Sequence, residues 1–267
     1  MKSALPPLKR FGQNFLIDNN IVRKIISSVS LTKNDRVLEI GPGRGILTHE
    51  LAESARSVVA IEIDRGLCSE LEAHNNFSNL DILCKDILKF DIARFAKKNK
   101  IKSFKVVANL PYYITTPIIE YLFSNRRYIK DIFIMVQREV ADRMTSCPKR
   151  KSYSAFSCFI NYFSMPEALF NIKGSCFFPA PKVDSSFVRL SLFSDPAKYH
   201  GVRSEKFLFE IMRAAFGQRR KQIGGVLARK LGHRTMSKLG CHAFLRCRAQ
   251  DLSLKDFISL SNLLSGS

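Results

Sequence analysis

The chain has 267 residues, 46% of them hydrophobic and 25% charged, which is enough for one large domain or for a larger and a smaller one. Lysine and arginine total 43 against 23 acidic residues, and the net charge of +20 favours a polyanionic partner such as nucleic acid over a merely soluble basic surface. No apolar run approaches the roughly 18 residues of a membrane span, and the N-terminus lacks the apolar core of a signal peptide, so we expect a cytoplasmic protein without membrane contact.

The cysteines and histidines show no pattern of a metal site or a disulfide framework. The seven cysteines are odd in number and no two of them form a CxxC pair. The five histidines form no cluster with the spacing of metal ligands. We therefore predict no metal and a reducing compartment.

The first half of the chain alternates expected strands with expected helices. A helix is expected over residues 19–28, after a basic lead that contains prolines. Apolar, β-branched runs then predict strands, each followed by a helix or a turn. These strands are expected at 36–40, 57–62, 80–84, 104–108 and 131–136. Such alternation is typical of an α/β fold with a parallel, doubly wound sheet.

The second half changes character twice. Residues 165–193 are rich in strand-forming residues and predict an antiparallel hairpin that closes the sheet. Asp195-Pro196 marks a boundary, and beyond it apolar residues recur at helical spacing. We therefore expect two domains, residues 1–195 and a small helical domain of residues 196–267. Residues 198–250 carry 13 lysines and arginines against two acids, so the helical domain should share the contact with a polyanion.

Four residues that are suited to ligand binding fall at the ends of successive predicted strands. Gly41, Glu62, Asp86 and Asn109 lie 21, 24 and 23 residues apart. Right-handed crossovers bring the carboxyl ends of parallel strands to one edge of a sheet, where ligands bind. Each residue alone could be a tight turn, a helix cap or a satisfied asparagine. Together they predict a site for a cofactor that carries a nucleoside.

The loop after the first of these strands suggests which cofactor. Gly41, Gly43 and Gly45 alternate with Pro42 and Arg44. A dinucleotide fingerprint places its third glycine one residue later, where a helix N-terminus receives a pyrophosphate. The tighter loop suits a ligand without phosphate, such as S-adenosylmethionine. Glu62 is then placed to accept both ribose hydroxyls, and Asp86 the amine of the adenine.

The turn Asn109–Tyr112 joins a strand to a helix. Thr116-Pro117 predicts the helix start, as an N-cap followed by a first-turn proline. Pro111 restrains Leu110 to an extended conformation. The turn thus presents an amide, backbone carbonyls and the Tyr112 ring, a set that suits a flat polar ring.

Five motifs in chain order extend the match to nearly the whole chain. They are Phe11-Gly-Gln-Asn-Phe-Leu, Glu39 to Gly45, Asn109-Leu-Pro-Tyr-Tyr, Phe177 with Pro179-Ala-Pro-Lys-Val-Asp-Ser185, and Phe216-Gly-Gln-Arg-Arg-Lys221. In these motifs the sequence resembles the ribosomal RNA adenine N6,N6-dimethyltransferases, the KsgA family of bacteria and its eukaryotic relatives. The resemblance implies a Rossmann-like, S-adenosylmethionine-dependent methyltransferase domain with a small C-terminal helical domain.

The resemblance also implies a substrate and roles for particular residues. Two adjacent adenosines, in a hairpin loop near the 3′ end of 16S rRNA in the small ribosomal subunit or its precursor, would each receive two methyl groups from a monomeric enzyme. Residues carried over as cofactor contacts are Asn14 and Leu16 of the N-terminal arm, Gly41 and Gly43 of the loop, Glu62, Asp86 and Asn109. Those carried over as RNA contacts are Arg219, Arg220 and Lys221, for which a solvated helix end is the alternative.

The expected chemistry follows from the poor nucleophilicity of adenine N6. Hydrogen bonds from its NH₂ to the Asn109 side-chain oxygen and to a Leu110 or Pro111 carbonyl would localise the nitrogen lone pair. Tyr112 would stack on an extruded adenine and Phe177 would cover its other face, unless Phe177 is a core aromatic. After the basic run, Gly224 and Gly225 weigh against a continuous helix.

Three other functions stay open at this point. A related methyltransferase could act on large-subunit RNA and confer antibiotic resistance. A ribosome-assembly or transcription factor could keep the fold for binding alone. A nicotinamide oxidoreductase is disfavoured by the glycine spacing.

Overall fold

The computed structural model describes residues 6–8, 12–232 and 243–265. Phe11, His233, Cys241 and His242 lie outside these ranges. Residue contacts divide the chain into a sheet unit, residues 1–141 and 167–192, and a helical unit, residues 142–166 and 193–267. The expected boundary at 195 lies close to this division, but no pattern in the sequence indicates that residues 142–166 group with the C-terminal helices. The division into domains of residues 1–195 and 196–267 stays a prediction.

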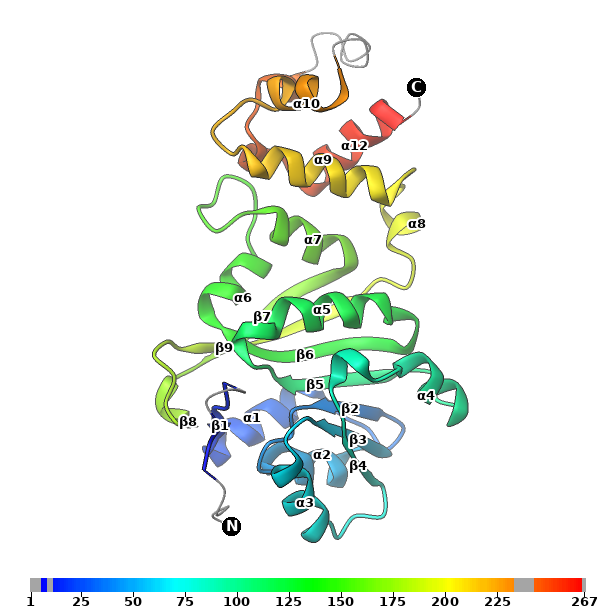
Figure 1. The fold of residues 1–267 in the computed structure, drawn as a ribbon, viewed down its shortest axis with the longest axis vertical. Helices are drawn as coiled ribbons and strands as arrows, with labels where there is room; N and C mark the ends of the chain where they lie inside the picture. Colours follow the sequence, from blue (N-terminus) through cyan, green and yellow to red (C-terminus); the bar gives the residue numbers. More distant parts are fainter. Residues whose placement is uncertain (1–5, 9–11, 233–242, 266–267) are drawn as a thin grey trace. The chain divides into compact units, whose positions relative to one another are not determined.

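The sheet unit is built on seven strands in the order β4-β3-β2-β5-β6-β9-β7 (Figure 1). The strands from β4 to β6 are parallel, and β9 joins β6 antiparallel. Their bounds are β2 Arg36–Ile40, β3 Ser57–Glu62, β4 Leu80–Cys84, β5 Phe104–Asn109, β6 Ile129–Gln137, β7 Ser164–Ile172 and β9 Ser185–Leu192. The expected doubly wound sheet with antiparallel strands at its end is confirmed.

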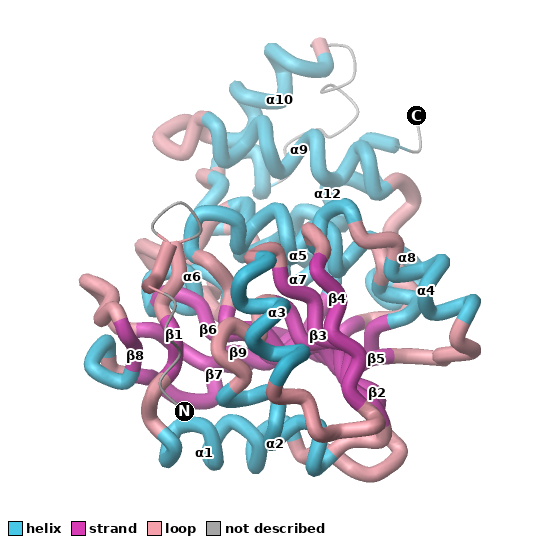
Figure 2. The backbone as a smooth tube through the Cα atoms, turned by 60° about the horizontal axis from the view of Figure 1, so that its bottom comes forward, coloured by secondary structure: helices cyan, strands magenta, loops and turns pink. Residues whose placement is uncertain are grey.

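Helices lie on both faces of this sheet (Figure 2). They are α1 Asn19–Val29, α2 Ile46–Ser54, α3 Arg65–Ala73, α4 Ile92–Lys98 and α5 Thr115–Ser124, and α6 Arg138–Met144 follows β6. Because both faces are covered, the central strands are almost wholly apolar and buried. One core cluster joins Val22 and Ile25 of α1 and Leu51 of α2 to alternate strand residues such as Val37 and Val107.

The register of the parallel strands aligns their carboxyl ends. Ile40 pairs with both Ile61 and Ala108, and Glu62 pairs with Cys84. The residues that follow these pairs therefore gather along one edge, as the spacing of the four strand-end residues predicts. At this edge α5 begins at Thr115 after a 3-10 turn, Tyr112–Ile114, so the predicted N-cap at Thr116 is wrong.

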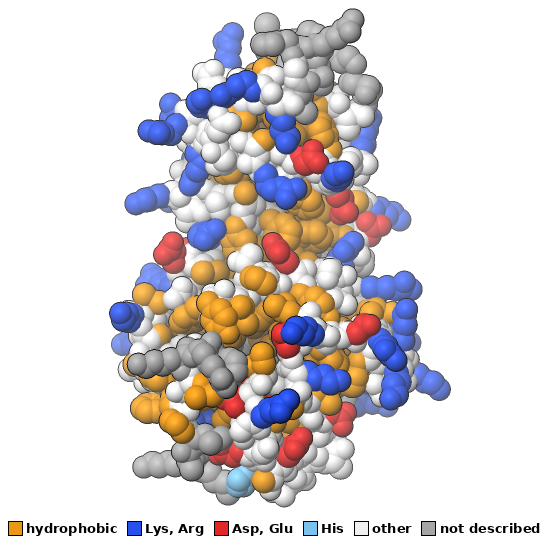
Figure 3. Space-filling view, in the orientation of Figure 1, with side chains coloured by type: hydrophobic (Ala, Val, Ile, Leu, Met, Phe, Trp, Pro, Cys, Tyr) orange, Lys and Arg blue, Asp and Glu red, His pale blue; other side chains and the backbone are white. Residues whose placement is uncertain are grey.

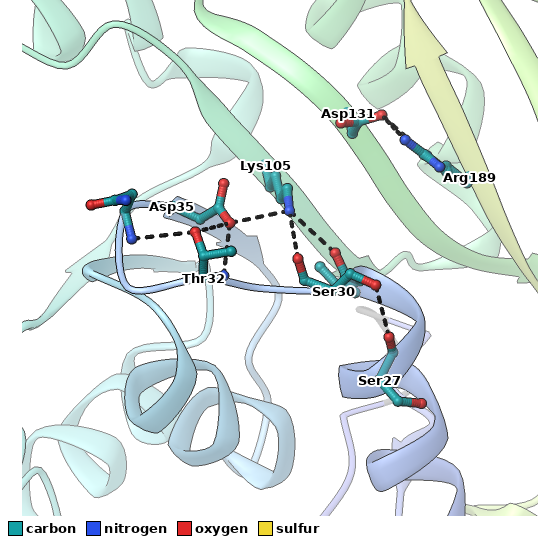
Figure 4. Close-up of polar contacts among 9 residues, drawn as sticks. Ser27, Ser30, Thr32, Asp35, Lys105, Asp131 and Arg189 are labelled. Carbon is teal, nitrogen blue, oxygen red and sulfur yellow. Dashed lines mark hydrogen bonds and ion pairs between the residues drawn. The ribbon is translucent and has the colours of Figure 1, made fainter.

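Two ion pairs connect segments of the sheet unit (Figure 4). The Lys105 Nζ lies 3.2 Å from Asp35 Oδ2 and also donates to the Ser30 carbonyl, which joins β5 to the end of α1. The Arg189 guanidinium donates to Asp131 Oδ1 across the β6–β9 pair, and the Asp131 side chain is 5% exposed. These contacts hold the sheet without taking part in its ligand edge.

The helical unit has its own core. Its helices are α7 Ala155–Phe163, α8 Pro196–His200, α9 Glu205–Gly217, α10 Ile223–Leu231 and α12 Leu254–Ser265, with 3-10 turns at Ala243–Arg246 and Ala249–Asp251. Leu208, Ile211 and Met212 of α9 are buried as their spacing predicts. The chain leaves helical conformation between α9 and α10, yet Gly224 and Gly225 lie inside α10. A Cβ at Gly224 would come within 3.0 Å of the Leu245 carbonyl oxygen, so close packing explains that glycine.

Among the residues that the structure describes, no three His, Cys, Asp or Glu side chains gather as a metal ion would require. Within the same ranges no helix has the length and apolarity to cross a membrane.

Candidate functional site

A cavity opens in the sheet unit where β2, β3, β4 and β5 end. The predicted residues that line it are Asn14, Gly41, Gly43, Glu62, Asp86, Asn109, Leu110, Pro111 and Tyr112. The structure therefore brings most of the predicted cofactor and catalytic residues into one place, from segments almost a hundred residues apart. Leu16 and Phe177 do not line it, and Arg219, Arg220 and Lys221 belong to the helical unit.

The Asn109 side chain is held by the N-terminal arm. Its Nδ2 donates to the backbone carbonyl of Asn14 over 2.9 Å, and the Nδ2 of Asn14 donates to the Gly12 carbonyl. Because Nδ2 is used in this way, Oδ1 of Asn109 is the side-chain atom left to accept a hydrogen from a ligand. The arm thus fixes which end of the amide a ligand meets.

The backbone carbonyls of the same turn are not equivalent. The Pro111 carbonyl accepts from the Ile114 N–H over 3.2 Å and from the Thr115 hydroxyl over 3.2 Å. These bonds use both of its lone pairs. Of the two carbonyls that the sequence left open, that of Leu110 is therefore the one suited to a ligand.

The Tyr112 ring lies next to this turn. Its hydroxyl forms a 2.9 Å hydrogen bond with the hydroxyl of Ser185, at the start of β9. Burial raises the pKa of Tyr112, while the Ser185 hydrogen bond opposes that shift, so the side chain is a neutral phenol. The ring is half-buried and lines the cavity, which leaves it able to stack on a flat ligand.

Glu62 is a buried carboxylate with most of its acceptor positions in use. Its Oε1 accepts from the backbone N–H groups of Ile63 and Asp64, and its Oε2 accepts from the N–H of Gly43. Burial raises the pKa of Glu62, and these three N–H groups counter the rise. About one acceptor position remains, on Oε2. The arrangement therefore offers one hydroxyl a partner, where the sequence suggested two.

Asp86 follows β4 and also caps a short 3-10 helix, Ile87–Lys89. Its Oδ1 accepts from the Leu88 N–H over 3.0 Å, so Oδ2 is the oxygen available to a ligand. The capping role and the ligand role, which were alternatives at the level of sequence, are compatible in one side chain.

The glycine loop leaves room for a ligand to lie directly against its backbone. Gly41 and Gly43 have φ of +69° and +59°, a region in which side chains are strained. A Cβ at Gly43 would lie 3.0 Å from the Phe15 ring. Glycine is therefore needed at this position for both conformation and space.

Glu39 lies beneath this loop. It is 2% exposed, and its Oε2 has no hydrogen-bond partner among the described residues. Burial raises its pKa to about 8, the nearby Thr48 hydroxyl opposes that rise and the charge of Glu62 adds to it. With Asn109 it lines a small pocket that shares Gly41 and Gly43 with the main cavity. A buried, unpartnered carboxyl at this point suits a cation or a donor.

The N-terminal arm crosses the cavity edge. Gln13 donates to the Asp64 carboxylate over 3.0 Å, and strand β1, Phe15–Leu16, pairs with β8, Phe177–Phe178. Leu16 is buried in the core cluster and lines only the small pocket. The arm therefore meets the cavity through residues 12–15, Asn14 among them, and Leu16 anchors it.

The structure does not support the stacking role of Phe177. Its ring is 3% exposed and belongs to the core cluster of the sheet unit, which is the alternative that the sequence left open. The neighbouring ring of Phe178 is 50% exposed. The strand pairing with β1 explains this, because successive side chains on a strand face opposite ways.

These two phenylalanines give a matched test of the fold. Phe177→Ala should lower the free energy of unfolding by about 3–5 kcal/mol, because it empties a packed core position. Phe178→Ala should cost less than about 1 kcal/mol. Urea unfolding of the two variants measures the difference, and equal losses would contradict the burial of Phe177.

The predicted RNA contacts follow α9 in the helical unit. Arg219, Arg220 and Lys221 are all exposed, and Arg219 also donates to the Tyr153 carbonyl over 2.8 Å. Arg219 thus has a contact within the protein, while the exposed side chains of Arg220 and Lys221 are placed for a contact at the surface.

Sequence reasoning missed several residues that line the cavity. Ile63 and Ile87 directly follow Glu62 and Asp86, and apolar side chains at these places suit the faces of a flat ring. The repeated acid-isoleucine pair at two strand ends was a signal that could have found them. Gln13 gave no such signal, because its role depends on a contact with Asp64 that only the fold creates.

Comparison with known proteins identifies the family. Residues 8–265 of the chain match the model of the family described as "ribosomal RNA adenine dimethylase". The chain belongs to this family. A ribosomal RNA small subunit methyltransferase A of Lachnoclostridium phytofermentans is 45% identical over 268 residues, which cover 96% of this chain and 91% of that protein. The corresponding protein of Clostridioides difficile is 40% identical, covering 96% and 90%.

Solved structures of similar proteins agree with the fold. A dimethyladenosine transferase from Plasmodium falciparum has a TM-score of 0.81 and 26% identity, with 94% of this chain and 96% of that chain covered. The 23S rRNA methyltransferase ErmE has a TM-score of 0.71 and 25% identity, with 94% and 100% covered. As a member of the adenine dimethylase family the chain is a methyltransferase, which decides against the oxidoreductase alternative and against a fold kept only for binding.

Proposed function

We propose that this dimethylase-family enzyme transfers methyl groups from S-adenosylmethionine to N6 of two adjacent adenosines in the hairpin loop near the 3′ end of small-subunit rRNA, giving N6,N6-dimethyladenosine. The observation that carries the proposal is the Asn109 turn. There one side-chain oxygen and one backbone carbonyl are left as acceptors at the mouth of a cavity suited to a nucleoside.

The residues present fit S-adenosylmethionine. Glu62 has one acceptor position for a ribose hydroxyl, and Asp86 Oδ2 suits the adenine amine. The unpartnered Oε2 of Glu39 suits an ammonium group, and the glycines at 41 and 43 leave room for the chain that carries it. When bound, the cofactor supplies a methyl group on a sulfonium centre, which is an electrophile.

The protein acts on the adenine amine. In the first transfer Asn109 Oδ1 and the Leu110 carbonyl accept the two N6 hydrogens, which draws the nitrogen lone pair out of the ring. In the second transfer one N6 hydrogen remains, and one of these acceptors takes it. Tyr112 stacks on the base and fixes the attack direction. With S-adenosylmethionine bound, each transfer would replace one N6 hydrogen by a methyl group, the demethylated cofactor would be the leaving group and the displaced proton would pass to water. No residue of the turn needs to act as a strong base.

The relatives favour the small subunit over the large one. Eight curated relatives, at 38–45% identity, carry the small-subunit name, whereas the large-subunit enzyme is 25% identical and has the lower TM-score of the two structures. The net charge of +20 supports an RNA partner. We also propose that the enzyme is monomeric and cytoplasmic.

Methyl transfer to purified subunits tests the proposal. Labelled S-adenosylmethionine is incubated with the enzyme and with small or large ribosomal subunits from cells that lack the modification. Label should enter the RNA of the small subunit alone. Label found only in large-subunit RNA would replace the proposal by the large-subunit alternative, and label in neither would reject both.

A further inference from the structure

The helical unit contains a cavity of about 800 Å³ for which the proposed reaction has no use. All the residues that line it belong to this unit, from α7, α8, α12 and the segments beside them. Its principal side chains are Asn161, Met165, Phe193, Tyr199, His200 and Lys255. We call it the Tyr199 cavity. Its volume lies in the range of small-molecule sites, large enough for a nucleotide.

One wall of the Tyr199 cavity is a built aromatic platform. The rings of Phe193 and Tyr199 stack with centroids 4.0 Å apart and an interplanar angle of 19°. His200 meets both rings edge-on, at 5.3 Å and 4.8 Å. Tyr199 is nevertheless 64% exposed, so one face of its ring is fixed by Phe193 while the other is available. An exposed, immobilised ring of this kind is typical of stacking sites for bases.

The polar groups around the platform suit the edge of a base. Asn161 donates its Nδ2 to the carbonyls of Met144 and Ser157, so its Oδ1 is left as an acceptor. His200 shares a 3.1 Å hydrogen bond with the Tyr162 carbonyl, and burial lowers its pKa, so the ring is neutral at pH 7. The cavity therefore combines a flat apolar wall with a few placed polar atoms.

The charge around the cavity favours an anionic ligand over a cationic one. None of the described residues that line it is Asp or Glu, and Lys255 on α12 is exposed at its edge. The helical unit carries 18 lysines and arginines against six acids. Figure 3 shows that blue basic side chains outnumber red acidic ones on the face in view. A phosphate-bearing ligand fits this balance.

We propose that the Tyr199 cavity binds an unpaired nucleotide of the RNA substrate, with its base stacked on Tyr199 and its phosphate near Lys255. This inference rests on the proposed function, because it takes RNA to be the substrate. The nucleotide is a second contact, distinct from the adenosine that is methylated, and it would fix the register of the RNA on the helical unit.

RNA binding by single-site variants of the full chain tests the inference. The probe is a fluorescent single-stranded oligoribonucleotide of about twelve nucleotides, the length that such binding sites span, followed by anisotropy at fixed salt. Tyr199→Leu keeps an apolar side chain against Phe193 but removes the flat face, and it should weaken binding about tenfold. Tyr199→Phe keeps the ring and should bind within about twofold of the wild type. Leu263→Ala is the control, because Leu263 is 49% exposed on α12 and does not line the cavity.

A second measurement does not depend on a variant. Photocrosslinking of the wild type to the same RNA, with 4-thiouridine in place of uridine, should label Tyr199 or a neighbour in α8. Equal affinity of Tyr199→Leu and wild type, equal losses in the Leu and Phe variants, or crosslinks confined to other elements would each overturn the inference.

The assay separates this inference from the proposed function. Tyr199→Leu should bind S-adenosylmethionine as the wild type does, and its KM for small subunits should rise with the loss of RNA affinity. If the wild type methylates small subunits and Tyr199→Leu binds RNA normally, only the inference fails. If the wild type methylates neither subunit, the proposed function fails.

Discussion

Replacing Asn109 with alanine is expected to lower kcat for methyl transfer by about a thousandfold, the scale of loss when one preorganised group that stabilises a transition state is removed. The Oδ1 of Asn109 is one of the two acceptors proposed for the adenine amine, and the bond from Nδ2 to the Asn14 carbonyl fixes its direction. Affinity for RNA should stay within a few-fold, because the proposed phosphate contacts lie elsewhere. Single-turnover kinetics with labelled cofactor, beside an RNA-binding titration, measures both quantities.

Asn34→Ala is the matched control for this variant, since Asn34 is an exposed asparagine of the same unit. It should transfer methyl groups at the wild-type rate. An Asn109→Ala enzyme with normal turnover would remove the catalytic role of the turn, whatever the control does. A variant that loses RNA affinity as strongly as turnover would instead make Asn109 a binding residue.

Glu39→Gln is expected to change how stability depends on pH. In the folded protein the pKa of Glu39 is raised to about 8, above its ordinary value of 4.5. Below pH 4.5 the carboxyl is protonated in both the folded and unfolded states. As the pH rises from 4.5 to 8 only the unfolded state loses this proton, so the free energy of unfolding of the wild type falls, by about 4 kcal/mol in all. Glutamine has no proton to lose and escapes this decline.

Chemical denaturation between pH 5 and pH 8.5 measures the effect. The stability of Glu39→Gln relative to the wild type should increase steadily over this range. Glu53→Gln, at an exposed position of α2, is the control and should show no such trend. If the unfolding free energies of the wild type and Glu39→Gln changed in parallel with pH, Glu39 would not be the buried carboxyl that stays protonated in the folded state. The same variant should also bind S-adenosylmethionine more weakly, because an amide cannot lose a proton to pair with the ammonium group, as the Glu39 carboxyl can.

The sequence allowed most of the site to be predicted because the site depends on local patterns repeated at regular spacing. Gly41, Glu62, Asp86 and Asn109 each end a strand whose apolar run is plain, and parallel packing with right-handed crossovers brings such ends together without further information. The register of β2, β3, β4 and β5 realises that arrangement.

What the sequence could not supply depends on contacts between distant segments. Residues 177 and 178 are both phenylalanine, so the residue type does not show which of them is buried. Only the pairing of β8 with β1 decides that Phe177 faces the core. The choice between the Leu110 and Pro111 carbonyls depends on two hydrogen bonds from the start of α5. Residues 142–166 join the helical unit because α7 packs against α9, and no local sequence pattern predicts this tertiary contact.

The number of ribose contacts at Glu62 illustrates the same limit. A carboxylate at a strand end suggests two hydroxyl partners, but three backbone N–H groups already occupy most of its acceptor positions. Those N–H groups come from the glycine loop and from the turn after β3, and their convergence on one side chain is a property of the folded edge.

Mapping the methylated adenosines in ribosomal RNA tests the central claim most directly. Ribosomal RNA from cells with and without this protein is digested and analysed by mass spectrometry for N6,N6-dimethyladenosine. We expect two adjacent dimethylated adenosines in the hairpin near the 3′ end of small-subunit RNA when the protein is present, and unmodified adenosines there when it is absent. The same two dimethylated adenosines in cells that lack the protein and every relative of it would contradict the account.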